Sequence, residues 1–481
     1  MLFNSIEFIF FFLPISLFIY FLLNKFKLTT LSKAFLGIAS LFFYAWWNIK
    51  YLFLIIFSIL VNFSLGYILG QIHNNKIKEF ISRKIILIIG LIFNVGLLAY
   101  FKYTDFLIST TNVLFKTNIN LLHIILPLGI SFFTFQKIAY LVDSSKGEVK
   151  EYNFLNYLLF VGFFPQLIAG PIVHHKEIMP QFNKLRSKVL NYKNLASGIV
   201  LFIIGLSKKV LIADTLSVIV GAGFDKAQSL TLIEGWLITF AYTFQLYFDF
   251  SGYSDMAIGI AKMFNIDLPL NFNSPYKAKN IQDFWRRWHM TLSKFLRDYI
   301  YIPLGGNRGS EFLIYKNVII TFFIGGLWHG AAWTFVVWGL LHGIALAFFR
   351  FWQKTNIILN QYLAQFITFL FVCFTWIIFR AKDWTAVKKI FVSLFNFTNI
   401  EFPKIKDFNF IFNHSESQIK WLISDVLLII ICFYLCFCSI NSIELVKKFK
   451  PNIVWLLGIA VLFCSFILNM NKISEFIYFQ F

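Results

Sequence analysis

The sequence predicts an all-α protein that crosses a membrane many times, and three observations carry this prediction. Hydrophobic residues make up 58% of the 481 residues and charged residues only 14%, against about 25% charged in soluble domains. The mean hydropathy is +0.71. Apolar runs of roughly 18 or more residues, the length that crosses a ~30 Å hydrocarbon core, recur from end to end. Because backbone groups in a bilayer must pair within the segment, we expect these runs to be helices.

The expected spans follow one another along the chain and leave no room for a large soluble domain. Two of them are too long for a single crossing, so we predict roughly 11 to 13 transmembrane or re-entrant helices. We expect one integral domain over residues 1–481, with its core motifs between 160 and 350. The expected spans are Phe8–Leu23, Ala34–Trp47, Leu52–Leu69, Ile85–Phe101, Leu122–Val142, Tyr157–Val173, Gly198–Ala213, Leu232–Met263, Val318–Phe349, Tyr362–Phe379, Trp421–Ser439 and Ile453–Leu468.

The charge distribution predicts the orientation. The net charge of +20 comes largely from short loops between spans, where Lys and Arg hold a chain on the cytoplasmic side, so we expect no nucleic-acid partner. Basic loops such as the one with Lys25 and Lys27 alternate with less basic ones such as Lys102–Asn120. The N-terminus is therefore expected outside the cytoplasm. The most basic loop, between Lys277 and Lys316, is expected inside.

Several kinds of chemistry have no motif here. The five cysteines all lie in apolar segments without a paired Cys/His set of zinc spacing, so we expect them to pack and predict no metal. There is no ATP-binding loop, nucleophile elbow or dinucleotide fingerprint. Histidines in a membrane, without metal or nucleotide motifs, suit general base catalysis of acyl transfer.

Residues 161–171 differ from the other apolar runs because they contain two prolines and two glycines. Such breaks are tolerated in a bilayer only where protein or a water-filled cavity satisfies the freed backbone groups. The segment is either a broken or re-entrant helix beside a cavity or a plain kinked span.

Asp249 and Asp255 place two carboxylates in an apolar run. A lone ionised carboxylate in hydrocarbon must find a partner or become neutral. The two could orient a histidine, relay a proton or bind a Lys or Arg of a neighbouring helix.

Residues Asp283–Tyr299, taken as one helix, are amphipathic. Trp285, Trp288 and His289 fall on the apolar side, whereas Arg286 and Arg287 fall on the basic side. We expect this helix to lie at the cytoplasmic face. The two arginines are either interfacial anchors or contacts for the phosphates of an anionic substrate. His289 is either a packed histidine or a functional one.

His329 lies several residues inside an apolar zone. The stretch Lys316–Arg350 would span about 51 Å as one straight helix, so it must be tilted, broken at its glycines or folded into two spans. Gly326 and Gly330 allow neighbouring helices to approach closely, and small residues there could equally open a cavity. A histidine at such depth is a functional candidate by default. His342, about 220° further round a continuous helix, is expected to be structural.

Five motifs together resemble the membrane-bound O-acyltransferase family. They are Phe164-Pro-Gln-Leu-Ile-Ala-Gly-Pro171, Gly205-Leu-Ser-Lys-Lys209, Gln245-Leu-Tyr-Phe-Asp-Phe-Ser-Gly-Tyr-Ser-Asp255, Phe284-Trp-Arg-Arg-Trp-His289 and Gly326-Leu-Trp-His-Gly330. The match is nearest to the bacterial branch that O-acetylates alginate or peptidoglycan.

The resemblance implies a ring of tilted helices around a tunnel, which an acyl thioester enters from the cytoplasm and a hydroxyl acceptor from the other side. It implies that His329 is the catalytic base and His289 the second histidine, near the cytoplasmic mouth. The residues expected to bind substrate or line the tunnel are Asp249, Tyr253, Asp255, Trp285, Arg286, Arg287, Trp288 and Trp328.

The expected function is transfer of acetyl from cytosolic acetyl-CoA across the bacterial inner membrane to a cell-envelope polysaccharide, alginate or peptidoglycan. The expected partners are the lipid bilayer, the thioester donor, the polysaccharide and an extracytoplasmic acetyltransferase protein, with no bound cofactor. The alternatives are D-alanyl transfer from a carrier protein to teichoic acid and, from another class, a proton-coupled transporter or flippase.

Overall fold

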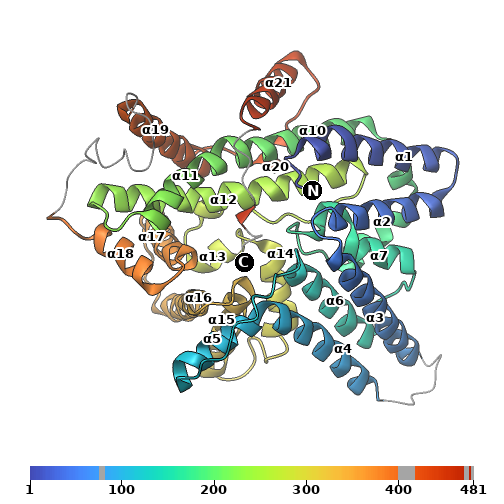
Figure 1. Ribbon diagram of the computed structural model, residues 1–481, viewed down its shortest axis with the longest axis horizontal. Coiled ribbons are helices and arrows are strands. Elements are labelled where there is room, and N and C mark those ends of the chain that lie inside the picture. Colours follow the sequence, from blue (N-terminus) through green and yellow to red (C-terminus); the bar gives the residue numbers. More distant parts are fainter. Residues whose placement is uncertain (75–81, 399–417, 471–475, 478–481) are drawn as a thin grey trace. The chain divides into compact units, whose positions relative to one another are not determined.

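The computed structural model describes residues 1–74, 82–398, 418–470 and 476–477. Throughout these ranges the regular structure is helical and no strand forms (Figure 1). Seven described helices are long and apolar enough to cross a membrane, and three further apolar helices are shorter. The prediction of an all-α polytopic protein is confirmed. The seven long helices are Glu7–Lys25, Lys50–His73, Arg83–Phe115, Tyr192–Lys226, Glu311–His329, Trp333–Thr355 and Gln361–Arg380.

The chain divides into two compact units. Unit 1 comprises Met1–Ile203 and Tyr253–Leu270, and unit 2 comprises Ile204–Gly252 and Asn271–Phe481. Helices α10 (Tyr192–Ser207) and α12 (Leu232–Met263) each contribute residues to both units. The other helices that begin and end in unit 1 are η1 (Glu7–Phe12), α1 (Leu13–Lys25), α2 (Thr29–Ala45), α3 (Lys50–His73), α4 (Arg83–Leu98), η2 (Ala99–Tyr103), α5 (Thr104–Phe115), α6 (Ile130–Ser145), α7 (Phe154–Gly162), α8 (Phe164–Leu167), α9 (His175–Ile178), η3 (Met179–Asn183) and η4 (Leu185–Lys188).

Unit 2 holds the remaining helices. They are η5 (Lys208–Ala213), α11 (Asp214–Gly221), η6 (Ala222–Lys226), η7 (Pro275–Lys277), α13 (Ile281–Trp285), α14 (Met290–Leu296), η8 (Arg297–Tyr301), α15 (Glu311–His329), α16 (Trp333–Trp352), η9 (Gln353–Thr355), α17 (Gln361–Arg380), α18 (Trp384–Leu394), α19 (Gln418–Phe437), α20 (Ser442–Lys447) and α21 (Ile453–Leu468).

Polar side chains join the apolar helices of unit 1. Asn62 of α3 and Asn94 of α4 exchange two amide hydrogen bonds, 2.6 and 3.2 Å long. The fully buried Lys137 of α6 donates to the Ser58 hydroxyl of α3 at 2.8 Å. Hydrogen bonds between helices are one source of association in a bilayer, where apolar side chains gain little by leaving lipid.

In unit 2, α15 and α16 form a hairpin and α17 packs beside α16 (Figure 1). The hairpin needs Gly326 and Gly339, since a Cβ atom on Gly326 would lie 2.4 Å from the Phe335 carbonyl oxygen and 3.0 Å from the Gly339 Cα. The close approach expected at Gly326 is confirmed. Of the three arrangements open for Lys316–Arg350, the chain adopts two helices, which are separated at Gly330.

Two expected boundaries were wrong. The span expected over Leu122–Val142 begins only at Ile130, because the preceding residues form no helix. The stretch Lys102–Asn120, expected as a loop, instead continues the Arg83–Phe115 helix for most of its length. Of the two alternatives stated for residues 161–171, the chain adopts the broken helix, since the extended ψ of +115° at Phe163 separates α7 from α8.

The single amphipathic helix expected over Asp283–Tyr299 was also wrong. The segment is two short helices, α13 and α14, followed by the η8 turn. His289 separates them with a φ of +43°, in the left-handed region that few non-glycine residues adopt. The periodicity was right for the apolar side but could not show the break. The strained backbone at a histidine is a hint of function.

Candidate functional site

His329 ends α15 inside an aromatic enclosure in unit 2. Its side chain is buried, with 3% of the residue exposed. The ring centroids of Trp328, Trp338 and Phe379 lie 4.9, 5.0 and 5.3 Å from that of His329. Gly330 makes this packing possible, because a Cβ atom there would lie 2.1 Å from the Phe335 ring. The His329 ring is therefore enclosed by aromatic side chains of α15, α16 and α17.

His289 is fully buried beside this enclosure. Its Nδ1 lies 2.9 Å from Oδ1 of Asn271, which also accepts a hydrogen bond from the Thr291 hydroxyl at 2.9 Å. Because a carbonyl oxygen only accepts, Nδ1 carries the proton and Nε2 has the free lone pair. His289 lies between the candidate spans, and burial lowers its pKa to about 3. The ring is therefore neutral near pH 7.

The two histidines are neighbours. Their ring centroids are 6.4 Å apart, and Trp328 contacts both, at 5.9 Å from His289 and 4.9 Å from His329. The backbone holds the His289 turn in place, since the Met290 amide donates to the Asn271 carbonyl at 2.9 Å. The structure thus brings together the two histidines that the sequence singled out, although 39 residues separate them in the chain.

His342 is held by hydrogen bonds on both ring nitrogens. Trp285 Nε1 donates to its Nδ1 at 3.2 Å, and its Nε2 lies 3.1 Å from the Thr375 hydroxyl. Since Nδ1 accepts, Nε2 carries the proton and donates to Thr375. This fixed, neutral tautomer in a fully buried ring agrees with a structural role for His342.

The tryptophans and arginines expected in the site divide into different environments. Trp285 supports His342, and Trp288 is buried with its ring 4.9 Å from Trp376. Arg287 is engaged internally, because its Nε lies 2.8 Å from the Asp283 carboxylate. Arg286 is exposed. Of the two arginines, Arg286 is the one accessible to an anionic substrate.

Asp249 forms a buried ion pair with a lysine. Lys209 Nζ of η5 lies 2.7 Å from a carboxylate oxygen of Asp249 and 2.7 Å from one of Asp214. All three side chains are at least 95% buried, and the Ile477 amide donates to Asp249 at 3.0 Å. Phe250, the next residue, packs edge-on against His289 at 4.8 Å. Of the roles left open for Asp249, the structure shows the ion pair.

Tyr253 and Asp255 belong to unit 1, where both are buried. The Tyr253 ring stacks on Phe3 with 4.8 Å between centroids. Their expected place in a tunnel wall stays a prediction.

Sequence reasoning missed several residues of the enclosure. Asn271 selects the tautomer of His289 and lies 18 residues before it in the chain. Trp338 packs on His329 and lies 9 residues after it. The indole N–H of Trp338 is buried and has no hydrogen-bond acceptor among the described residues. The only signal in the sequence was that this Asn and this Trp lie close to the motifs that contain His289 and His329. In unit 1, a cluster of Asp143, His174 and His175 was also missed.

Comparison with known proteins gives a consistent family. The sequence model of the membrane-bound O-acyltransferase family matches residues 142–382. The chain is 49% identical over 420 residues to a peptidoglycan O-acetyltransferase of Helicobacter pylori, covering 81% of this chain and 79% of that protein. It is 39% identical over 406 residues to a probable alginate O-acetylase of Pseudomonas aeruginosa, covering 82% and 75%. A teichoic acid D-alanyltransferase of Bacillus subtilis is 30% identical over 271 residues, or 53% and 69%.

Proposed function

The chain belongs to the membrane-bound O-acyltransferase family, and we propose that it moves an acetyl group from cytosolic acetyl-CoA across the membrane to hydroxyl groups of a cell-envelope polysaccharide. The observation that carries this proposal is the pair of buried histidines, with ring centroids 6.4 Å apart, in an aromatic enclosure. Two imidazoles enclosed by aromatic side chains suit proton transfer during acyl transfer better than they suit binding of a charged solute.

His329 is the general base of the proposed reaction. Its neutral ring takes the proton of the acceptor hydroxyl as the oxygen attacks the thioester carbonyl carbon. The carbon–sulfur bond breaks, and the leaving thiolate takes up the proton from the imidazolium. The products are the acetyl ester and the free thiol, so the histidine is regenerated and no cofactor is consumed. His289, neutral and fixed by Asn271, lines the path of the thioester.

Trp338 supplies a hydrogen-bond donor for the same step. Its ring centroid lies 5.0 Å from that of His329, and its buried N–H has no acceptor among the described residues. A buried donor without a partner carries a desolvation cost that a substrate oxygen can offset. The carbonyl oxygen of the thioester becomes negative during attack, and a placed donor is worth most there. Trp338 therefore stabilises the oxyanion.

The relatives give an order to the candidate acceptors. The 49% identity to a peptidoglycan O-acetyltransferase exceeds the 39% identity to a probable alginate O-acetylase, so peptidoglycan is the first candidate. D-alanyl transfer from a carrier protein to teichoic acid ranks second, because that relative is 30% identical over only 53% of the chain. An extracytoplasmic acetyltransferase partner completes the transfer in this proposal, and the N-terminus faces the same side.

A deletion strain tests the proposed function. Ester-linked acetate, released from purified peptidoglycan and other envelope polysaccharides by mild base, should fall in the deletion strain. It should return with the wild-type gene and not with His329→Ala produced at the same level in the membrane. Proteoliposomes that contain the purified protein should release free thiol from acetyl-CoA when an acceptor is present.

Other outcomes would redirect the assignment. D-alanine esters that disappear from teichoic acid while acetate is unchanged would select the D-alanyl reaction. Proton-coupled solute flux without thiol release, unaffected by His329→Ala, would overturn the enzyme and support a transporter.

A further inference from the structure

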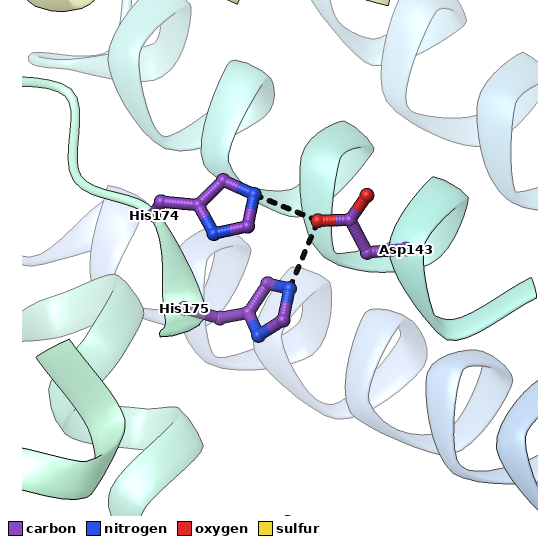
Figure 2. A group of neighbouring side chains, drawn as sticks. All are labelled: Asp143, His174 and His175. Atoms are coloured by element: carbon purple, nitrogen blue, oxygen red, sulfur yellow. Dashed lines mark hydrogen bonds and ion pairs between the residues drawn. The ribbon is translucent and has the colours of Figure 1, made fainter. Parts of the chain in front are cut away.

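A second histidine site lies in unit 1, at the end of α6 and the start of α9. His174 Nε2 lies 2.7 Å and His175 Nε2 lies 2.9 Å from the same carboxylate oxygen of Asp143. Figure 2 shows both rings turned toward that oxygen from one side of the α6 helix. Asp143 and His175 are each 3% exposed, so the cluster is built into the fold rather than lying on its surface.

The backbone arranges this convergence. Consecutive residues of an extended chain point to opposite sides, yet the rings of His174 and His175 lie 4.5 Å apart and only 36° from parallel. The change of conformation between them accounts for this, because His174 is extended with φ −102° and ψ 139° and His175 begins α9. The rings of Tyr140 and Phe160 flank His175 edge-on at 6.1 and 6.3 Å. Both imidazoles are thus directed at one point.

We propose that Asp143, His174 and His175 bind a divalent transition-metal ion. Two imidazole nitrogens and one carboxylate oxygen are a ligand set that zinc accepts, with three protein ligands and one position left for water. All three donor atoms lie within 4.8 Å of one another. At bond lengths of about 2.0–2.2 Å, ligand atoms around a tetrahedral ion are roughly 3.3 Å apart. The observed nitrogen–oxygen distances therefore need to open by about half an ångström.

The charges favour a cation at this point. Asp143 brings one negative charge to two rings that are neutral when they bind metal, and a divalent ion reverses the sign of the site. The neighbouring Lys176 does not oppose this strongly, since its ammonium group is paired with Glu148. His174 is 18% exposed at its side chain, which leaves a route for the ion and for the water that completes its shell.

One contact must be given up. His174 Nδ1 accepts a long, 3.4 Å hydrogen bond from the Lys176 amide, which requires the ring proton on Nε2. Metal binding at Nε2 moves that proton to Nδ1 and releases the amide. The loss is small beside two metal–nitrogen bonds. The bound ion would link α6, through Asp143, to the segment that follows Pro171, through His174. These two ligands are 31 positions apart in the sequence.

Titration of the purified full-length protein tests the proposal independently of acyl transfer. After dialysis against a chelator, the wild-type protein should bind one equivalent of zinc by calorimetry, and cobalt should give the visible absorption of a tetrahedral ion. His174→Gln, His175→Gln and Asp143→Asn should each weaken zinc binding by at least 10-fold. His123→Asn is the matched control, because His123 is exposed with a positive φ that Asn tolerates.

Thermal unfolding separates the possible results. Zinc should raise the midpoint in wild-type and His123→Asn protein and not in the three ligand variants. If the chelator-treated wild type binds no zinc or cobalt, or if the ligand variants bind as tightly as wild type, the proposal is overturned and the cluster is a histidine–carboxylate hydrogen-bond network only. The wild-type measurement decides the question even if a variant fails to fold.

Discussion

The two groups of histidines differ in what surrounds their rings. In unit 1, His174 and His175 both face the carboxylate of Asp143 at 2.7 and 2.9 Å. In unit 2, His329 faces the rings of Trp328, Trp338 and Phe379, and His289 is held by the neutral amide of Asn271. The unit 1 rings therefore meet an anionic group, whereas the unit 2 rings meet aromatic side chains and a neutral amide.

The comparison shows that histidines in one chain can lie in two different chemical environments, which suit different functions. In our proposals, the unit 1 cluster holds a cation. In unit 2, the proposed reaction has His329 take up a substrate proton, as a base does, while His289 lines the path of the thioester. Substitutions in the unit 1 cluster should therefore affect thermal stability in the presence of metal. Substitutions in the unit 2 pair should affect the rate of acetyl transfer.

Removal of the proposed catalytic base should give the largest effect. His329→Ala should lower the rate of acetyl transfer by about 10² to 10⁴, the usual contribution of a placed base, with little change in thermal stability. Asp143→Asn should instead lower the midpoint of thermal unfolding, and its rate should fall only as far as the folded fraction does. Initial rates and unfolding curves of the same proteoliposome preparations compare the two. Equal losses of rate per folded molecule would erase the distinction between the sites.

Loss of the proposed oxyanion donor should come next. Trp338→Phe keeps the aromatic wall beside His329 but removes the N–H, and it should lower kcat by roughly 10²-fold. The KM for the thioester should change little, because the bond is strongest in the transition state. Trp333→Phe, at the 52% exposed start of the same helix, is the control and should leave kcat unchanged. A loss confined to KM would assign Trp338 to ground-state binding.

The buried ion pairs of Lys209 test how the surroundings of a charged group affect stability. Lys209→Met leaves the carboxylates of Asp214 and Asp249 buried without their shared cation, and should destabilise the protein by about 3–5 kcal/mol. Asp249→Asn should cost much less, because Lys209 and Asp214 remain a neutral pair. The double variant Lys209→Met with Asp249→Asn should recover part of the loss in thermal unfolding. Additive losses would show that the three groups do not share one charge balance.

The smallest change within the range measured is expected in the pH dependence of stability between pH 7 and 5. Burial lowers the pKa of His289 to about 3, below its ordinary value of about 6.5. As the pH falls below about 6.5 the unfolded chain binds a proton that the folded chain refuses, so stability decreases toward pH 3, by roughly 1.4 kcal/mol per pH unit. His289→Gln should flatten this dependence in unfolding midpoints measured between pH 7 and 5. An unchanged slope would show that the His289 ring is not kept neutral by burial.

The sequence by itself determined the class of the protein and singled out two of its buried histidines. Apolar runs with few charges can be stable only as helices in a bilayer, and this constraint is local enough to read from composition. Histidines inside such runs are costly, which is why His289 and His329 stood out without a structure. Periodicity also identified the apolar side of the segment around Trp285 and Trp288.

Only the tertiary structure decided where helices break and which residues meet. The left-handed turn at His289 is not encoded by any local pattern. The break between α15 and α16 brings the two helices so close that a Cβ atom added to Gly326 would lie 2.4 Å from the Phe335 carbonyl oxygen, and no local pattern encodes that packing either. Asn271, Trp338 and the Asp143 cluster were missed for the same reason. Their partners are distant in sequence, and only the folded chain brings a tautomer-fixing amide, an indole N–H or a shared carboxylate to a histidine.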